Sequence, residues 1–218
     1  MTSFQALAAP TIESFTSAFL RSSEPSPRLM VVLHGLGDSL EGFRWLPSAA
    51  GLNRYNFLLV NAPLDYGEGF AWYDPERDPQ PELERGRARL GRLFAELEGQ
   101  GWASADILLF GFSQGCVMAA DFGMRWDQPL AGIIGVSGYI FFSNTVEAEI
   151  HPEARRQSWL ITHGTYDSLL PVDRTRDQVR RLKRLGMRVD WMEVRKDHSI
   201  DMGDELAAIR AWIVDHAY

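Results

Sequence analysis

A pentapeptide near the middle of the chain places a serine where it could act as a nucleophile. Gly111-Phe112-Ser113-Gln114-Gly115 follows the apolar run 107–110 and precedes an apolar, helix-compatible stretch, residues 116–122. A strand that turns sharply into a helix would hold Ser113 in a strained backbone conformation, and the two glycines remove the Cβ atoms that would collide there. The hydroxyl of Ser113 would then stand above the edge of a sheet.

The G-x-S-x-G pattern is weak by itself, because it occurs by chance in any glycine-rich chain. The alternative to a nucleophile is therefore an ordinary strand-to-helix turn. Here both flanking runs are present, which favours the nucleophile. A serine hydroxyl is a poor nucleophile at neutral pH, so the chain must also supply a base and a group that orients this base.

His198 is the candidate base among the five histidines. It follows the apolar run 189–194 by a short loop and precedes a helix that we expect Asp201 to cap, with Asp204 and Glu205 in the first turn. This position would put His198 at the carboxyl edge of a parallel sheet. The competitors are His34, in the loop after the first buried run, His163, at the end of the run around Trp159, and His151 and His216, which lack a strand-end context.

Asp167 is the candidate for the acid that orients the imidazole. It lies in the loop after the expected strand 159–161 and before a helix that could begin near Pro171. The competing aspartates are Asp173, expected in the first turn of that helix, Asp190, expected inside a strand, and Asp197, which is adjacent to His198 and poorly placed to reach its far nitrogen.

The order Ser113, Asp167, His198 is the order of nucleophile, acid and base in α/β-hydrolases, and it differs from the chymotrypsin and subtilisin orders. His198 would accept the proton of Ser113 and return it to the leaving group. Asp167 would select the imidazole tautomer and stabilise its cation.

Two backbone N–H groups are candidates for an oxyanion hole. Gln114 would open the helix after Ser113, so its N–H lacks an intrahelical partner and lies at the positive end of the helix dipole. His34-Gly35-Leu36-Gly37-Asp38 is a glycine-containing loop beyond an expected strand, which would let the N–H of Leu36 approach a substrate.

The sequence indicates no cofactor and no metal. A dinucleotide fingerprint that began at Gly35 would need a glycine at position 40, which is Leu40, and no H-E-x-x-H or paired Cys/His spacing indicates zinc. Cys116 is interpreted as a buried helix residue that packs against the sheet, not as a second nucleophile.

The composition fits one soluble domain. The chain has 218 residues, is 45% hydrophobic and carries a formal net charge of −7, which disfavours binding to nucleic acid or to anionic lipid. The single cysteine allows no internal disulfide, no apolar run is long enough to cross a bilayer, and no basic residue precedes Arg21. We therefore expect a cytoplasmic protein without stable membrane insertion.

Short apolar runs alternate with helical patterns, as a parallel sheet covered by helices requires. The expected strands are residues 29–33, 57–60, 107–110, 133–136, 159–161 and 189–194, and one-sided apolar stripes predict helices around residues 83–97, 179–185 and 206–213. The predicted fold is α/β, a mostly parallel central sheet flanked by helices, without a separate cap domain. Residues 1–28 would pack on this sheet, and residues 29–218 would form a single catalytic domain.

Six motifs of the chain together resemble one protein family. They are His34-Gly35-Leu36-Gly37-Asp38-Ser39, Ala71-Trp72-Tyr73-Asp74, Gly111-Phe112-Ser113-Gln114-Gly115, Val136-Ser137-Gly138-Tyr139, His163-Gly164-Thr165 with Asp167, and Asp197-His198-Ser199-Ile200. Their combination is similar to the small carboxylesterase/phospholipase family of α/β-hydrolases, which includes acyl-protein thioesterases and bacterial carboxylesterases. The resemblance spans about residues 29–214. It implies serine hydrolysis of carboxylic esters with short or medium acyl groups, in some members of thioesters or lysophospholipids, with the Leu36 and Gln114 amides in the oxyanion hole.

Apolar residues in loops expected near Ser113 are candidates for contact with an acyl chain. Trp72 and Leu169 are the stronger candidates, and Leu36, Phe70 and Leu170 are further ones, with packing of the loops on the core as the alternative. The loop 62–71 is shorter than the family's usual segment, and Ser168 stands where a proline commonly follows the acid. These departures limit how far the family's acyl-chain preference can be carried over to this chain.

These observations predict a carboxylesterase that forms an acyl-enzyme on Ser113 and releases it by attack of water, with a small-molecule ester as its substrate. A thioesterase or lysophospholipase is the alternative within the family, and a non-catalytic acyl-binding protein is the alternative of another class. Phe141 and Phe142 could line the pocket, cover a loop or contribute to a homodimer surface. The basic cluster in residues 174–184 is interpreted as a solvated helix face.

Overall fold

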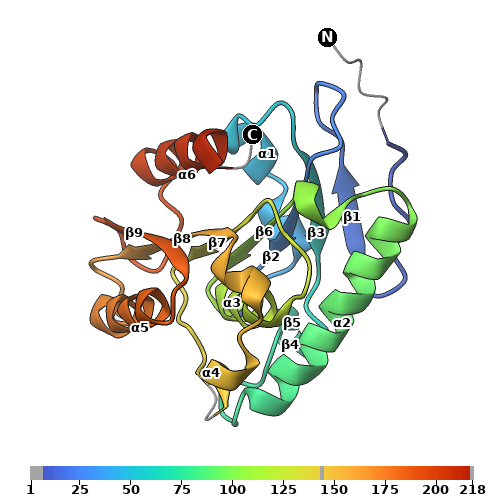
Figure 1. Ribbon diagram of the computed structural model, residues 1–218. Coiled ribbons are helices and arrows are strands. Elements are labelled where there is room, and N and C mark those ends of the chain that lie inside the picture. The colour runs from blue at the N-terminus through green and yellow to red at the C-terminus, as the bar shows by residue number, and fades with distance from the viewer. Residues whose placement is uncertain (1–6, 143–144, 217–218) are drawn as a thin grey trace.

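The computed structural model describes residues 7–142 and 145–216, which form a central sheet between two layers of helices (Figure 1). Residues 1–6 of the expected N-terminal segment lie outside this described part. Seven strands make up the sheet, in the spatial order β1 (Ser17–Leu20), β3 (Asn56–Val60), β2 (Leu29–Leu33), β6 (Ile107–Phe112), β7 (Gly132–Val136), β8 (Ser158–Gly164) and β9 (Arg188–Val194). All neighbouring pairs are parallel except β1 with β3, and no separate cap covers the described part of the sheet. The predicted α/β fold is confirmed.

The six expected strands are all present, and most of them extend beyond their apolar runs. β8 continues to Gly164 and β6 to Phe112, so that polar residues of the predicted motifs lie within or directly after strand ends. The edge strand β1 was not predicted. Its four residues are all partly exposed, so Ser17–Leu20 lacks the continuous apolar run that marks a buried parallel strand.

Helices cover both faces of the sheet. Their bounds are α1 Leu46–Ala50, α2 Gln80–Gly99, α3 Gln114–Arg125, α4 Val146–Glu149, α5 Val172–Arg184 and α6 Asp204–His216. Apolar residues of α2, α3 and α5 share one buried cluster with one face of the sheet, while those of α1 and α6 share the other. The three predicted apolar stripes thus face the sheet.

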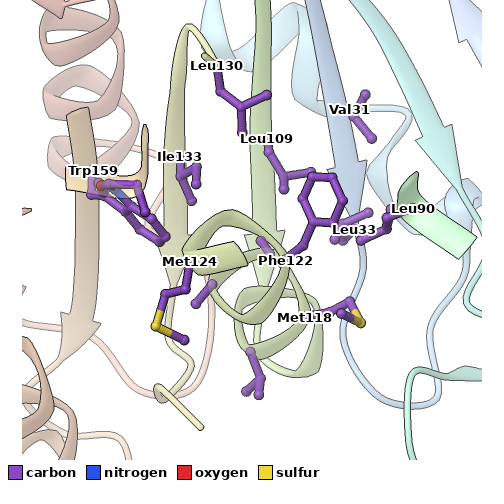
Figure 2. Packing of buried hydrophobic residues seen from close by; sticks show 14 of the residues in the cluster. Val31, Leu33, Leu90, Leu109, Met118, Phe122, Met124, Leu130, Ile133 and Trp159 are labelled. Atoms are coloured by element: carbon purple, nitrogen blue, oxygen red, sulfur yellow. Dashed lines mark hydrogen bonds between the residues drawn. The ribbon is translucent and has the colours of Figure 1, made fainter. Parts of the chain in front are cut away.

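Helix α3 is the most deeply buried helix in the described residues, because it is enclosed between the sheet and α2. All of its residues except the last are buried. Figure 2 shows Phe122 close to Leu109 of β6, and Met124 on the side of α3 toward Ile133 and Trp159. Burial of each such side chain contributes about 1.5–3 kcal/mol. The helix that begins after Ser113 is therefore firmly held.

A small hairpin outside the sheet supports the loop that follows β2. Strands β4 (Leu64–Tyr66) and β5 (Gly69–Ala71) pair antiparallel, and Phe70 exchanges backbone hydrogen bonds with this loop. The N–H of Gly37 donates to the Phe70 carbonyl at 2.8 Å, and the N–H of Phe70 donates to the Asp38 carbonyl at 2.9 Å. The hairpin thereby holds residues 35–38 at the carboxyl edge of the sheet.

A buried ion-pair network joins α3 to α2 and α4. Asp121 of α3 is 1% exposed, and its carboxylate accepts from Arg87 of α2 at 2.9 Å and from Arg125 at 2.5 Å. Arg125 also binds Glu149 of α4. Burial raises the pKa of Asp121, and the two guanidinium groups oppose this rise.

No helix in residues 7–142 and 145–216 combines the length and apolar character that crossing a membrane requires.

Replacement of Asp121 by alanine should lower the free energy of unfolding by about 3 kcal/mol, because it leaves two partly buried guanidinium groups without their shared carboxylate. Urea unfolding of the purified variant measures this loss. Asp177→Ala is the matched control, because Asp177 pairs with Arg180 at 2.8 Å on an exposed face and should change the free energy by less than about 1 kcal/mol. Equal effects of the two substitutions would contradict the role of the network.

Candidate active site

The turn between β6 and α3 holds Ser113 in a backbone conformation that residues other than glycine seldom adopt. Its φ is 53° and its ψ is −118°, and its N–H donates to the Val136 carbonyl of β7 at 2.9 Å. Such a conformation costs about 1–3 kcal/mol and persists only where the surroundings enforce it. Gly115 is required here, because a Cβ at this position would lie 2.1 Å from the carbonyl oxygen of Leu33. The sequence thus builds a turn that projects Ser113 from the sheet edge.

The structure brings Ser113, His198 and Asp167 together, although they come from three separate loops. Nε2 of His198 lies 2.9 Å from Oγ of Ser113, and Nδ1 lies 2.7 Å from Oδ2 of Asp167. A carboxylate can only accept, so Nδ1–H donates to Asp167 and Nε2 is left to accept from the serine hydroxyl. This chain of hydrogen bonds can pass the serine proton to the imidazole.

Asp167 is buried, yet it is held in its ionised form. Burial by itself would raise its pKa, but hydrogen bonds from the Leu170 N–H and from His198 outweigh this effect and lower the pKa. Oδ1 accepts from the N–H groups of Leu169 and Leu170 at 3.0 and 2.8 Å. The carboxylate therefore stays an acceptor for His198 and also anchors the loop that follows it.

Two of the four histidines that competed for the role of base, His34 and His163, have other contacts. His34 is buried, accepts from the Ala62 N–H at 3.0 Å through Nε2, and lies 2.6 Å from the Gly35 carbonyl through Nδ1. His163 reaches the Leu170 carbonyl at 2.7 Å and lies 3.4 Å from Asp167. Burial lowers the pKa of both imidazoles, so they remain neutral near pH 7. His34 connects the loop after β2 to Ala62, and His163 connects β8 to the loop at Leu170.

A buried lysine and glutamate enclose the loop that carries His198. Nζ of Lys196 donates to both carboxylate oxygens of Glu205 at 2.6 and 2.7 Å and to the Ser199 carbonyl at 2.7 Å. Glu205 of α6 also accepts from the Asp201 N–H at 2.9 Å. The carboxylate of Asp201 accepts from the N–H groups of Gly203 and Glu205, as expected for the residue that caps α6. These contacts hold both ends of the loop.

Both candidate oxyanion donors lie at the same pocket as Ser113. Gln114 is the first residue of α3, and its side chain is held by the Trp72 N–H and the Tyr73 carbonyl, each at 3.0 Å. The loop before Leu36 lies against Ser113, because a Cβ on Gly35 would be 3.2 Å from the Ser113 Cβ. An electron-rich oxygen bound above Ser113 would therefore lie near two backbone segments whose N–H groups can face it.

A mainly apolar pocket of about 510 Å³ opens beside Ser113 and His198. Among the predicted acyl contacts, Leu36, Leu169 and Leu170 line it, and Leu169 is 70% exposed at its rim. The lining is completed by Gly35, Asp38, Tyr73, Pro75, Phe112, Gln114 and Tyr139.

Two of the predicted contacts with the acyl chain, Trp72 and Phe70, are wrong, because neither residue lines the pocket. Trp72 is 0% exposed, and its indole N–H donates to the His34 carbonyl at 2.9 Å, so it packs beneath the loop and does not line the pocket. Phe70 lies in β5, where its backbone pairs with residues 37 and 38, and its ring packs near His34. Both aromatic residues support the loop instead of facing a ligand.

Other reactive groups nearby do not form a second site. Cys116 is buried, and burial raises the pKa of its thiol to about 12, which leaves it protonated and inert. Within the described part of the chain, no group of three or more His, Cys, Asp and Glu side chains is arranged to bind a metal ion.

Comparison with known proteins gives matches that span most of the chain. Residues 17–217 match the family model described as Phospholipase/Carboxylesterase. Acyl-protein thioesterase 1 of Schizosaccharomyces pombe is 27% identical over 168 residues, which cover 71% of this chain and 75% of that protein. The crystal structure of esterase PE8 is 29% identical with a TM-score of 0.79, over 93% of this chain and 99% of that one. An Oryza sativa subsp. japonica protein named as a probable inactive carboxylesterase is 26% identical over 212 residues, covering 88% and 86%.

The parallel sheet, the strained serine turn and the shared topology define an α/β-hydrolase. Because the family model covers nearly the whole chain, the protein belongs to the phospholipase/carboxylesterase family, a family of hydrolases. The resemblance inferred from the six motifs is thereby confirmed.

The supporting contacts of this site went unpredicted. Lys196 stands two residues before His198 and Glu205 seven residues after it, and their types alone suggest a solvated loop. The direct contact between Tyr73 and Tyr139 joins residues 66 positions apart. The motifs that contain His34 and His163 could be recognised in the sequence. That these two histidines are neutral and hold loops in place follows only from their burial and contacts.

Lys196→Met and Glu205→Gln should each lower the free energy of unfolding by about 3 kcal/mol, because each leaves a buried partner without its counter-charge. The double variant should lose less than the sum of the two, and a double-mutant cycle in urea measures the difference. Arg156→Met with Glu153→Gln, an exposed pair at 2.6 Å, is the control cycle and should show almost no coupling. Strict additivity at Lys196 and Glu205 would contradict a coupled pair.

Proposed function

We propose that this protein is a serine carboxylesterase that cleaves carboxylic esters of short to medium acyl chains. The observation that carries the proposal is the hydrogen-bonded chain from Asp167 through His198 to Ser113, which ends at an apolar pocket. Membership of the phospholipase/carboxylesterase family supports the same reaction class. The substrate is a small ester, and the reaction needs no cofactor.

In the proposed mechanism, Oγ of Ser113 attacks the ester carbonyl while Nε2 of His198 takes up the serine proton. The negative charge that develops on the carbonyl oxygen is stabilised by the N–H groups of Leu36 and Gln114. His198 then gives the proton to the departing alcohol, and an acyl-enzyme remains on Ser113. Water, deprotonated by His198, attacks this acyl-enzyme and releases the acid. Asp167 holds the imidazole in the required tautomer throughout.

The pocket sets the class of acyl group. Its apolar lining and its volume of about 510 Å³ suit a short or medium acyl chain more than a charged group. Of the predicted apolar contacts of the acyl chain, Leu36, Leu169 and Leu170 line the pocket, whereas Trp72 and Phe70 do not. The pocket opens to the surface at Leu169, so the alcohol part of the ester can extend outward.

A thioesterase is the second candidate, because the Schizosaccharomyces pombe relative is named an acyl-protein thioesterase. Oxygen esters and thioesters both pass through a tetrahedral oxyanion, so the same groups could act on either bond.

The two activities are separated by kcat/KM on matched oxygen and sulfur esters with the same acyl chain. We expect the higher value on the oxygen esters after division by the rate of spontaneous hydrolysis of each compound. Chain lengths from acetyl to decanoyl should give a maximum within the short to medium range. Consistently higher corrected values for the sulfur esters would overturn the assignment as a carboxylesterase.

Ser113→Ala should lower kcat by roughly a million-fold and abolish labelling by a fluorophosphonate probe, which reacts with activated serine hydroxyls. Mass spectrometry of the labelled wild-type protein should locate the probe on Ser113. Ser137→Ala is the matched control, because Ser137 is also buried near the site, has a positive φ of 49° and lies outside the proposed chemistry. It should still be labelled.

A non-catalytic acyl-binding protein is the candidate from another class, and the relative named as probably inactive gives it a specific basis. This alternative predicts that the correctly folded wild-type protein never reacts with the probe. Failure of labelling in a protein with a cooperative unfolding transition would therefore replace the proposed esterase by a binding protein.

A further inference from the structure

Two tyrosines form a hydrogen-bonded pair in the wall of the pocket beside Ser113. Tyr73 follows β5 and Tyr139 follows β7, and their hydroxyl oxygens lie 3.1 Å apart. Both residues line the pocket. The other large side chains of the lining are apolar apart from Gln114, Asp38 and His198, so this pair adds hydroxyl groups to an otherwise apolar wall.

The pair is tied to the turn that holds Ser113. The Tyr73 carbonyl accepts from the side chain of Gln114 at 3.0 Å, and Gln114 is adjacent to Ser113. Gly138, the neighbour of Tyr139, lies so close to the turn that a Cβ there would be 2.8 Å from the Ser113 carbonyl oxygen. Because Tyr73, Tyr139 and Ser113 line one pocket, a single bound molecule can contact the tyrosine pair and Ser113.

Helix α5 holds Tyr139 in place before any ligand binds. The hydroxyl of Thr175 donates to the Gly138 carbonyl at 2.8 Å, and the side chain of Gln178 accepts from the Ile140 N–H at 3.0 Å and donates to its carbonyl at 2.9 Å. The guanidinium of Arg174 lies 4.2 Å from the centre of the Tyr139 ring. A polar group held in this way is preorganised for recognition.

One hydroxyl of the pair is left as a free hydrogen-bond donor. Burial raises the pKa of Tyr73, so its hydroxyl remains protonated at neutral pH. Each phenol carries one O–H, and the pair makes one mutual hydrogen bond. Whichever tyrosine donates, the other O–H donates to no acceptor among residues 7–142 and 145–216. Because both tyrosines line the pocket, an oxygen of a bound ligand can accept this remaining O–H.

We propose that Tyr73 and Tyr139 select esters whose acyl chain carries a neutral hydrogen-bond acceptor, such as an ether or ketone oxygen, over plain alkyl esters. The inference rests on the proposed esterase function and names the substrate class of the same site. A neutral oxygen is favoured over a carboxylate, because Asp38 lines the same pocket, whereas the Arg174 guanidinium, although close to the Tyr139 ring, does not line it.

The test compares two series of p-nitrophenyl esters of equal chain length. One series has plain alkyl chains, and in the other an ether oxygen replaces a methylene at successive positions. For each position, kcat/KM of the ether ester is divided by that of the alkyl ester. This ratio should be at least about ten-fold higher in the wild type than in Tyr73→Phe/Tyr139→Phe for the best-placed oxygen, because the variant lacks both donors. Comparison across variants cancels the intrinsic reactivity of each ester.

The single variants sharpen the test. Tyr73→Phe and Tyr139→Phe each leave one hydroxyl that can donate to the ligand, so each should keep most of the preference. Tyr166→Phe is the matched control, because this exposed tyrosine accepts a hydrogen bond from Arg195 and does not line the pocket. Its ratio should equal that of the wild type.

The outcomes separate this inference from the function on which it rests. If the wild-type protein is labelled on Ser113 and hydrolyses both series, but the double variant keeps the wild-type ratio at every position, the tyrosine inference is overturned and the esterase stands. If the folded wild-type protein neither reacts with fluorophosphonate nor hydrolyses either series, the esterase itself fails.

Discussion

The meeting of three loops at one edge of the parallel sheet is the constraint on which the site depends. Ser113, Asp167 and His198 follow β6, β8 and β9, and parallel pairing through β7 places the carboxyl ends of these strands side by side. Because both faces of the sheet are buried, a shift of one residue in the register of a strand would exchange its side chains between the two apolar clusters and disrupt the packing of both. Apolar burial on both faces of the sheet therefore determines the hydrogen-bond distances within the site.

The site also contains several features that cost free energy of folding, and a nearby contact compensates for each of them. The positive φ of Ser113 is held by the burial of α3 and by the hydrogen bond to Val136. The buried charge of Lys196 is matched by Glu205, which comes from the helix after the loop. The desolvated carboxylate of Asp167 receives two backbone N–H groups from its own loop. Rigid surroundings of this kind keep Ser113 and His198 in contact in the absence of a ligand.

Much of the fold and the relation of Ser113, Asp167 and His198 could be predicted from the sequence, because continuous apolar runs mark buried strands and polar residues directly after them must share one edge. The prediction failed where this signal is absent or ambiguous. The strand Ser17–Leu20 is half exposed and carries no such run. Trp72 was expected to face a ligand, but an aromatic residue in a loop looks the same in the sequence whether it packs inward or outward.

The carboxylate of Asp167 serves two neighbours at once, since one oxygen faces His198 and the other receives the backbone of Leu169 and Leu170. The segment that lines the pocket and the imidazole that contacts Ser113 are thus linked through a single side chain. A small molecule that displaced this segment from the pocket would leave Ser113 unmodified and still disturb the contact between Asp167 and His198. Such a molecule would need no group that reacts with Ser113.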